Sequence, residues 1–314
     1  MTPSTVPLRR PRALRAGDRV ALVAPASAFD LARFESGVAE LRALGFEPVY
    51  DESVFARDLY LAGPPALRAA ALERAWRDPS IAAVWAVRGG FGSVHLLPLL
   101  DPAWPRSDPK VFVGYSDLTT LQIWLAQRAG LVSFQGPMLE GQLARGADGY
   151  VRDVLLRAIG MPEPVGELPA PGLEALAQGE AAGPVFGGTL TQIVASLGTP
   201  FAFDPPPGCV LFLEDVGERP YRLDRMVTQL GLAGILSRAA GLVLGTFRDC
   251  DEPGGALSAR AVLARLFDGF PGPVVAGLPV GHVEEPALTL PLGVRVRVVA
   301  DALPRVIVEE AAVV

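Results

Sequence analysis

Short apolar runs alternate with amphipathic segments along the first half of the chain. The runs with the pattern of buried strands in a parallel sheet are residues 19–27, 46–50, 81–87 and 110–116. The segments with apolar residues at helical spacing are residues 31–44, 65–77 and 118–127. Because strands that alternate with helices are joined by right-handed crossovers, this pattern predicts an α/β domain whose parallel sheet carries helices on both faces.

The pattern changes after about Ala147. Residues 161–184 are rich in proline, glycine, alanine and glutamate and show no clear periodicity, which favours a linker. Several apolar runs follow, and the last, VRVRVVAD, alternates valine with arginine as a half-exposed strand does. One helix is expected over residues 221–232. The predicted organisation is an α/β domain over residues 1–150, a linker over 151–184 and a β-rich domain over 185–314.

Composition narrows the classes of function. The chain has 314 residues, of which 50% are hydrophobic and 20% charged, so it can build a packed core. The net charge is −6, so the composition lacks the excess of basic residues typical of nucleic-acid-binding proteins, and we expect no nucleic-acid partner. With only two cysteines and two histidines, a zinc site and a disulfide scaffold are both disfavoured. We therefore expect no metal and no cofactor.

The N-terminal segment does not have the pattern of a targeting sequence. It is basic, and no apolar stretch of roughly 7–15 residues precedes Arg15, Asp18 and Arg19. The longest charge-free stretch, between Glu180 and Asp204, is interrupted by glycine, proline and threonine and does not predict a spanning helix. We interpret the chain as a cytoplasmic protein with free thiols and no membrane partner.

A serine stands where a buried strand meets a helix. In the segment KVFVGYSDLTTL, Ser116 follows the strand and precedes the helix. Ligands bind at the carboxyl ends of strands in open α/β folds, and a helix N-terminus offers unpaired N–H groups to a developing oxyanion. Ser116 is thus a candidate nucleophile. The motif is not a G-x-S-x-G elbow, since Leu118 stands where the second glycine would be. The alternative is that Ser116 or Asp117 only caps the helix.

Three other motifs each allow a chemical and a purely structural interpretation. The segment RGGFG, residues 88–92, follows a strand and is either a ligand-binding loop or a tight turn. Glu214 and Asp215 end a strongly apolar strand, where a carboxylate can orient an imidazole or simply meet solvent. His282 follows Gly281 in a loop and is a candidate general base, whereas His95 is expected to be structural. Together, Ser116, His282 and Glu214 supply a nucleophile, a base and an orienting group.

Five segments, taken in order, resemble the motifs of the LD-carboxypeptidase family of serine peptidases, which includes the microcin C immunity peptidases. They are RGGFGSVHLLPLLD, VGYSDLTTL, FGGTLTQIVASLGTP, LFLEDVGERPYRLDRMVTQL and GHVEEPALTLPLG. The resemblance runs from about Gly17 to Arg297. It implies a flavodoxin-like or Rossmann-like N-terminal domain, a β-rich C-terminal domain and a homodimer.

The resemblance also implies roles for particular residues. Ser116 in GYSD corresponds to the nucleophile, His282 in GH to the general base and Glu214 in LED to its orienting partner. The backbone N–H groups of Gly90 and Asp117 correspond to the oxyanion hole. The implied reaction is hydrolysis of an L-to-D peptide bond in a muropeptide tetrapeptide, which releases the terminal D-alanine in murein recycling.

Three positions depart from the family pattern. Phe91 stands where tyrosine is usual, His95 where arginine is frequent, and Thr189 where asparagine is common. None of them is a member of the implied triad. Two alternatives stay open: an immunity-like peptidase that cleaves aminoacyl-nucleotide amides, and a non-catalytic protein that binds muropeptides.

Overall fold

The chain folds as two units, each built around one sheet, in a computed structural model that describes residues 8–314. The first unit comprises residues 8–164, 284–291 and 311–314. The second comprises residues 165–283 and 292–310. The beginning of the segment in which we expect no targeting sequence, residues 1–7, lies outside the described residues.

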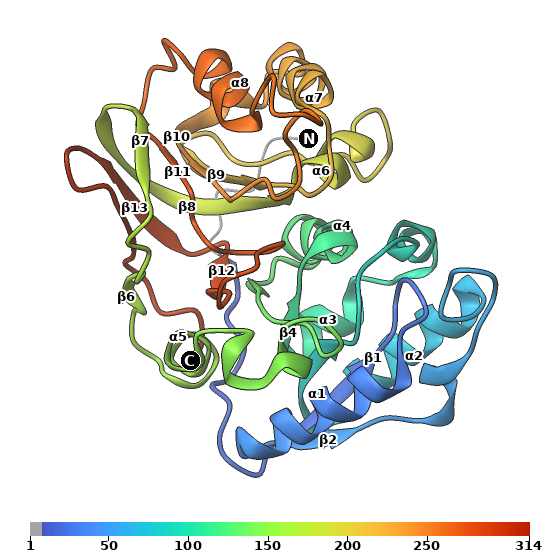
Figure 1. Cartoon of the computed structure of the whole chain (residues 1–314). Helices are drawn as coiled ribbons and strands as arrows, with labels where there is room; N and C mark the ends of the chain where they lie inside the picture. The colour runs from blue at the N-terminus through green and yellow to red at the C-terminus, as the bar shows by residue number, and fades with distance from the viewer. Residues whose placement is uncertain (1–7) are drawn as a thin grey trace. The chain divides into compact units, whose positions relative to one another are not determined.

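The apolar runs of the first half pair in a sheet that also contains β12, from the second half of the chain (Figure 1). The order of its six strands is β12-β5-β4-β3-β1-β2. Its strands are β1 (Arg19–Val23), β2 (Glu47–Val49), β3 (Ile81–Ala86), β4 (Val111–Gly114), β5 (Ser133–Gln135) and β12 (Leu290–Leu292). The pairings among β1 to β5 are all parallel. The spatial order 2-1-3-4-5 of these five strands is that of flavodoxin-like folds. The predicted parallel α/β domain is confirmed.

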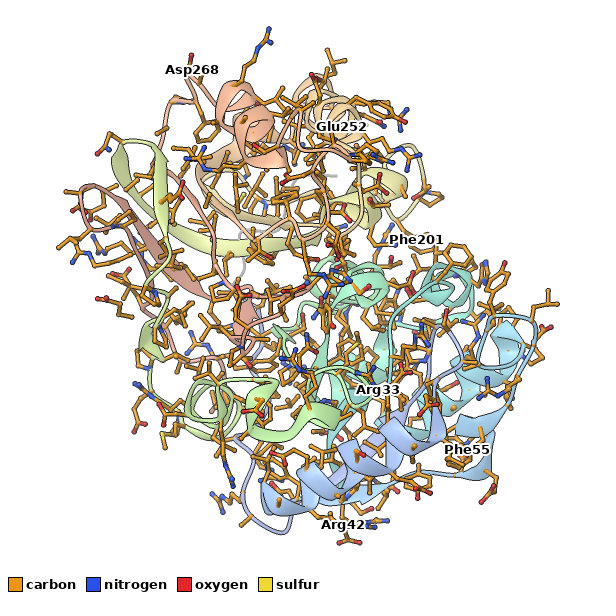
Figure 2. The ribbon with its side chains drawn as sticks, viewed as in Figure 1. Arg33, Arg42, Phe55, Phe201, Glu252 and Asp268 are labelled. Carbon is orange, nitrogen blue, oxygen red and sulfur yellow. The ribbon has the colours of Figure 1, made fainter. Side chains whose placement is uncertain are left out.

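Helices connect these strands, as the periodicity predicts. The first unit contains α1 (Leu31–Ala43), α2 (Pro65–Arg77), α3 (Ala103–Ser107), α4 (Thr119–Trp124), α5 (Arg152–Gly160) and the short turns η1 (Glu52–Phe55), η2 (Ser93–Leu99), η3 (Ser116–Leu118), η4 (Leu125–Ala129) and η5 (Leu143–Asp148). Asp30 caps α1 by accepting a hydrogen bond from the Arg33 N–H at 2.9 Å. Arg42 in the last turn of α1 is exposed (Figure 2). Phe55 packs edge-on against the buried Phe34.

The strand order reverses direction at one place in this sheet. The chain leaves β1 toward β2 on one side and later returns to β3 on the other side. The carboxyl ends of β1 and β3 are therefore a topological switch point, where open α/β sheets bind ligands. The Ser27 N–H after β1 donates to the Gly89 carbonyl after β3 at 3.1 Å, so the two loops that leave these strands are joined there.

The second unit holds an eight-stranded mixed sheet with the order β6-β14-β13-β8-β9-β10-β11-β7. Its strands are β6 (Gly166–Glu167), β7 (Glu174–Ala177), β8 (Gly179–Thr189), β9 (Cys209–Glu214), β10 (Ala239–Leu244), β11 (Val274–Ala276), β13 (Arg295–Ala300) and β14 (Arg305–Val308). β8 to β11 pair in parallel, and antiparallel strands flank them. The predicted β-rich C-terminal domain is confirmed.

Helices cover this unit more fully than the sequence predicts. They are α6 (Leu190–Ser196), α7 (Pro220–Leu232), the turn η6 (Leu236–Arg238) and α8 (Ala259–Leu266). Only α7 was expected, from its strongly amphipathic pattern, and it buries Leu223, Val227 and Leu230. α6 and α8 have seven and eight residues, too few for periodicity alone to indicate a helix.

The structure differs from the expected linker. Residues 151–184 contain α5, β6, β7 and the beginning of β8. The short strands there are rich in glycine and alanine, which have low intrinsic strand propensity. They become strands because β7 pairs with β11, β6 with β14, and β8 with β13. Across the described residues, no helix is long and apolar enough to cross a membrane.

Candidate active site

Ser116 occupies a strained turn at the end of β4. It is the first residue of η3, and its φ of 63° places it in the left-handed region that few residues other than glycine adopt. The N-cap residues of η3 and α4 are Tyr115 and Leu118, and neither makes a side-chain cap hydrogen bond. Ser116 therefore lies inside η3 and does not occupy the N-cap position of η3 or of α4. Strain of this kind costs about 1–3 kcal/mol and concentrates at functional sites.

The glycine-rich loop after β3 approaches this serine closely. A Cβ atom on Gly89 would lie 2.8 Å from the Ser116 Cβ, 3.0 Å from its Oγ and 3.3 Å from the Asp117 nitrogen. Since real Cβ atoms do not come this close to other atoms, only glycine fits at position 89. The RGG motif contains both glycines, and Gly89 adds to the expected role of Gly90 a second position that requires glycine.

Two backbone N–H groups near Ser116 are already engaged. The Phe91 N–H donates to the Ser27 Oγ at 3.1 Å, and the Ser93 N–H donates to the Asp117 Oδ2 at 2.8 Å. The candidate oxyanion donors are the backbone N–H groups of Gly90 and Asp117. Both donors belong to segments beside Ser116, and pairs of such N–H groups are what an oxyanion hole requires.

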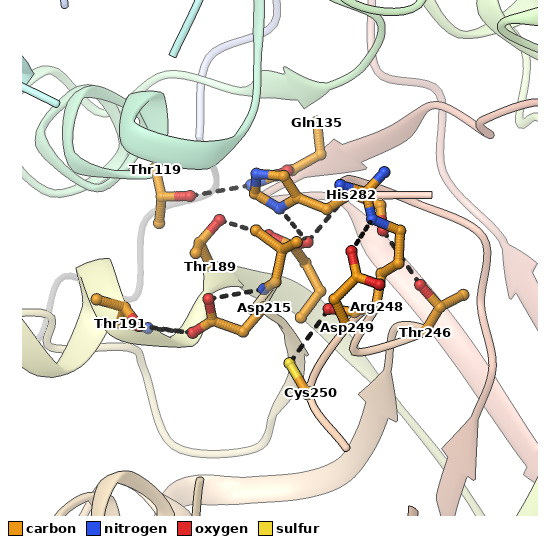
Figure 3. A network of polar contacts seen from close by, with 12 residues as sticks. Thr119, Gln135, Thr189, Thr191, Asp215, Thr246, Arg248, Asp249, Cys250 and His282 are labelled. Carbon is orange, nitrogen blue, oxygen red and sulfur yellow. Dashed lines mark hydrogen bonds and ion pairs between the residues drawn. The ribbon is translucent and has the colours of Figure 1, made fainter. Parts of the chain in front are cut away.

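Glu214 and His282 meet in the second unit. Glu214 is the last residue of β9, and its side chain is 1% exposed. Its Oε2 lies 2.8 Å from the His282 Nδ1 and accepts a further hydrogen bond from the His282 backbone N–H at 3.0 Å (Figure 3). Because a carboxylate can only accept, Nδ1 carries the proton, and in the neutral ring Nε2 is the atom that can take one.

Gly281 makes this approach possible. A Cβ atom on residue 281 would lie 2.6 Å from the Glu214 Oε2, so any side chain there would displace the carboxylate. The φ of Gly281 is 88°, which also favours glycine. The GH dipeptide of the sequence is thus explained, because the glycine lets the adjacent histidine close on the buried carboxylate.

A threonine completes the surroundings of Glu214, a role that the sequence analysis missed. The Thr189 hydroxyl donates to the Glu214 Oε1, so both carboxylate oxygens are engaged (Figure 3). Thr189 ends β8, which pairs in parallel with β9 and places Thr189 opposite Glu214. Threonine thus keeps a donor at a position where the family commonly has asparagine. Only the register of the two strands reveals this contact.

The contacts of Glu214 stabilise its charged form. Burial alone would raise the pKa of Glu214. The positive form of His282 and the hydrogen bonds from His282 and Thr189 outweigh burial and hold the pKa below its ordinary value. Glu214 is therefore a carboxylate at neutral pH and can stabilise an imidazolium on His282.

For Asp215, the next residue, burial outweighs the hydrogen bonds, so its pKa is raised. Its Oδ2 accepts hydrogen bonds from the Thr191 N–H at 2.8 Å and the Thr191 hydroxyl at 2.7 Å (Figure 3). Asp215 is 3% exposed. Burial, assisted by the nearby charge of Glu214, raises its pKa from 3.8 to about 6. Asp215 anchors the beginning of α6 and is not in contact with His282 in any hydrogen bond of the described residues.

This raised pKa predicts a pH-dependent stability. Between the unfolded pKa of 3.8 and the folded pKa of about 6, the folded state binds more protons at Asp215. The contribution of Asp215 to stability is therefore fully present below pH 3.8 and falls as the pH rises through 6, by about 3 kcal/mol in all. The Asp215→Asn variant lacks this loss. Its stability relative to the wild type should rise by roughly that amount between pH 4 and pH 7 in urea unfolding.

The exposed carboxylate of Asp268 on the same unit supplies the control. The Asp268→Asn variant should differ from the wild type by less than about 0.5 kcal/mol at every pH. A constant difference between Asp215→Asn and the wild type over this pH range would contradict the prediction.

His95 has a structural position, as expected. It lies on η2, and its Nδ1 is 3.3 Å from a terminal nitrogen of the buried Arg68. A guanidinium can only donate hydrogen bonds, so the His95 Nδ1 is the acceptor in this contact. The Phe91 ring packs edge-on against the His95 ring, with centroids 5.3 Å apart.

The structure brings the predicted residues together in two groups. Ser116, Asp117 and the loop with Gly90 are assembled in the first unit, and Glu214 and His282 in the second. No group of three or more histidine, cysteine or acidic residues that could hold a metal ion is found in the described part of the chain. The chemistry that these groups can perform is proton transfer and nucleophilic attack.

Comparison with known proteins identifies the family. A family model described as the LD-carboxypeptidase N-terminal domain matches residues 20–136, and one described as the C-terminal domain matches residues 182–298. The chain belongs to the LD-carboxypeptidase family. The family is one of peptidases, and the resemblance seen in the sequence is confirmed.

Two relatives and one solved structure illustrate what this chain is similar to. A putative carboxypeptidase of Streptomyces coelicolor is 41% identical over 302 residues, which cover 94% of each chain. The murein tetrapeptide carboxypeptidase of Pseudomonas aeruginosa is 35% identical over 277 residues, 84% of this chain and 88% of the relative. The solved structure of the microcin C7 self-immunity protein MccF has a TM-score of 0.88 at 24% identity and covers 96% of this chain and 99% of MccF. At that identity the likeness to MccF supports the fold alone.

Proposed function

We propose that this family member is a serine-type LD-carboxypeptidase with Ser116, His282 and Glu214 as its catalytic triad. The observation that carries the proposal is the hydrogen bond between the buried Glu214 and the His282 Nδ1. It selects the tautomer in which Nε2 is the nitrogen that accepts a proton. The strained position of Ser116 supports its role as nucleophile, since nucleophilic serines on α/β folds occupy such turns.

In the proposed acylation step, the Ser116 Oγ attacks the carbonyl carbon of the L-residue while its proton passes to the His282 Nε2. The Gly90 and Asp117 N–H groups donate hydrogen bonds to the negatively charged oxygen of the tetrahedral intermediate, and a donor of this kind is worth about 3–4 kcal/mol. When the intermediate collapses, the C–N bond breaks and His282 returns its proton to the amine of the leaving D-amino acid. Water, deprotonated by His282, then hydrolyses the ester on Ser116.

We propose a muropeptide tetrapeptide as the substrate, with D-alanine as the product released during murein recycling. The support is the name and the 35% identity of the Pseudomonas aeruginosa relative. The step needs only water besides the peptide, so the proposal includes no metal or cofactor. We further propose that the protein works in the cytoplasm and as a homodimer, as the family resemblance implies.

Mass spectrometry of muropeptide tetrapeptides incubated with the protein tests the proposal. The wild type should convert tetrapeptide into tripeptide and D-alanine, and the Ser116→Ala variant should not. An L-alanine epimer of the same tetrapeptide serves as the control substrate and should remain intact. Release of alanine from the epimer at the same rate would contradict specificity for the L-to-D bond.

The same assay separates the two alternatives. Hydrolysis of an aminoacyl-sulfamoyl adenosine, with the tetrapeptide left intact, would favour an immunity-like peptidase. Tight binding of the tetrapeptide without turnover, together with no covalent labelling of Ser116 by a fluorophosphonate, would favour a non-catalytic muropeptide-binding protein.

A further inference from the structure

Two segments far apart in the sequence carry the proposed oxyanion donors, and one pair of residues joins them reciprocally. The Ser93 N–H donates to the Asp117 Oδ2 at 2.8 Å, and the Ser93 Oγ donates to the Asp117 carbonyl oxygen at 2.7 Å. Ser93 lies three residues after Gly90, and Asp117 follows Ser116 directly. The two hydrogen bonds therefore connect the glycine loop to the nucleophile turn across 24 positions of the sequence.

A buried cation holds the other side of the same loop. The Arg68 guanidinium donates to the carbonyl oxygens of Gly92 at 2.8 Å, Pro25 at 2.5 Å and Gly63 at 2.9 Å. Arg68 is 3% exposed. Its charge also acts on the Asp117 carboxylate. The loop is thus attached on one side to Asp117 and on the other to Arg68, on α2.

The burial of these groups makes the arrangement rigid. Ser93 is fully buried and Asp117 is 1% exposed. Inside the protein, hydrogen bonds are stronger than in water, and a buried polar group without its partner is costly. The Ser93–Asp117 pair therefore permits little variation in the distance between the two segments. The pair does not belong to a helix or a strand ladder, so it is not explained by secondary structure.

We infer that Ser93 is a positioning residue whose paired hydrogen bonds with Asp117 set the spacing between the Gly90 and Asp117 N–H groups. Arg68 supports the pair by holding the loop at Gly92. The inference rests on the proposed function, because it assigns a task to residues that touch neither substrate nor reacting atoms. Oxyanion donors must be held within roughly 0.5 Å of the productive geometry, so a device that fixes their separation affects the transition state more than substrate binding.

The Ser93→Ala variant tests this inference, and Ser133 provides a matched control. Ser133 is also a buried serine of the first unit, and its hydroxyl has no hydrogen-bond partner among the described residues. For Ser93→Ala we expect kcat for D-alanine release to fall roughly ten-fold with KM changed less than about two-fold. For Ser133→Ala we expect both constants within about two-fold of the wild type. Equal kinetic effects in the two variants would overturn the inference.

A second readout does not depend on the substrate. A fluorophosphonate reacts with an activated serine, and its phosphoryl oxygen occupies the oxyanion hole in the transition state. We expect Ser93→Ala to be labelled at Ser116 roughly ten-fold more slowly than Ser133→Ala, with similar melting temperatures. If the wild type is labelled but releases no D-alanine, the proposed substrate fails while this comparison still decides the role of Ser93. If the wild type is not labelled at all, both proposals fail.

If Ser93→Ala does not fold, variants of its hydrogen-bond partner Asp117 test the same inference. Asp117→Asn keeps a side-chain oxygen that can accept the Ser93 N–H, whereas Asp117→Ala removes it. We expect the asparagine variant to be labelled several-fold faster than the alanine variant, because the acceptor is restored without the charge. Equal labelling of the two variants would overturn the inference, since the side chain would then not position the donors.

Discussion

The Ser116→Ala variant is expected to release D-alanine at least ~10⁴-fold more slowly than the wild type while keeping its fold. Alanine has no hydroxyl, so the ester intermediate cannot form and His282 has no serine proton to accept. The residual rate would come from the oxyanion donors and from binding alone. Alanine at φ 63° carries nearly the same backbone strain as serine, so the melting temperature should change by only a few degrees.

Two measurements check this result. A coupled assay for free D-alanine gives the rate, and mass spectrometry after fluorophosphonate treatment shows whether Ser116 is modified. Ser36 on α1 is exposed and offers a control, because Ser36→Ala should retain wild-type activity and labelling. Turnover by Ser116→Ala comparable to that of the wild type would remove Ser116 as nucleophile.

The second large effect is expected for Glu214→Gln, which should lower kcat roughly 10²–10⁴-fold with little change in KM. Glutamine has the size of glutamate, and the Thr189 hydroxyl can rotate to accept from the new amide group. The side chain therefore still fits, and its oxygen can still accept from His282. What disappears is the negative charge that stabilises the imidazolium when His282 takes the proton of Ser116.

The division of the effect between kcat and KM distinguishes this electrostatic role from simple damage to the fold. Without the carboxylate, the imidazolium that forms on His282 in the transition state loses its stabilisation, so kcat should fall while KM changes little. Unfolding measurements should show that Glu214→Gln is folded at the assay temperature. The Glu252→Gln variant is the control, since Glu252 forms only a partly exposed ion pair with Arg219. An unchanged kcat in Glu214→Gln would exclude Glu214 from the triad.

The local pattern of the sequence was sufficient to predict most of the longer elements of the first unit. Continuous apolar runs and helical spacing predicted the strands β1 to β4 and the helices α1, α2 and α4 within a few residues. Each of these elements buries one face along enough residues for the spacing of its apolar positions to be recognised in the sequence. β5 has three residues, and α5 falls where the composition favoured a linker, so neither left such a signal.

The candidate site, too, has residues that the sequence identified and contacts that it did not. Ser116, His282, Glu214, Gly90 and Asp117 could be named because each stands in a short motif beside a strand end. The contacts of Thr189, Ser93 and Arg68 could not be named. Each of them depends on a partner at least 24 positions away in the sequence.

The sequence by itself thus determined the class of fold, the family and the residue types available for catalysis, because these follow from periodicity and short motifs. Only the tertiary structure decided how these residues are held. Parallel pairing of β8 with β9 brings Thr189 to Glu214, and the strand order 2-1-3-4-5 brings the loop after β3 to Ser116 and to Ser93's partner, Asp117. Strand register and sheet order are settled by packing between distant segments, so no single segment contains them.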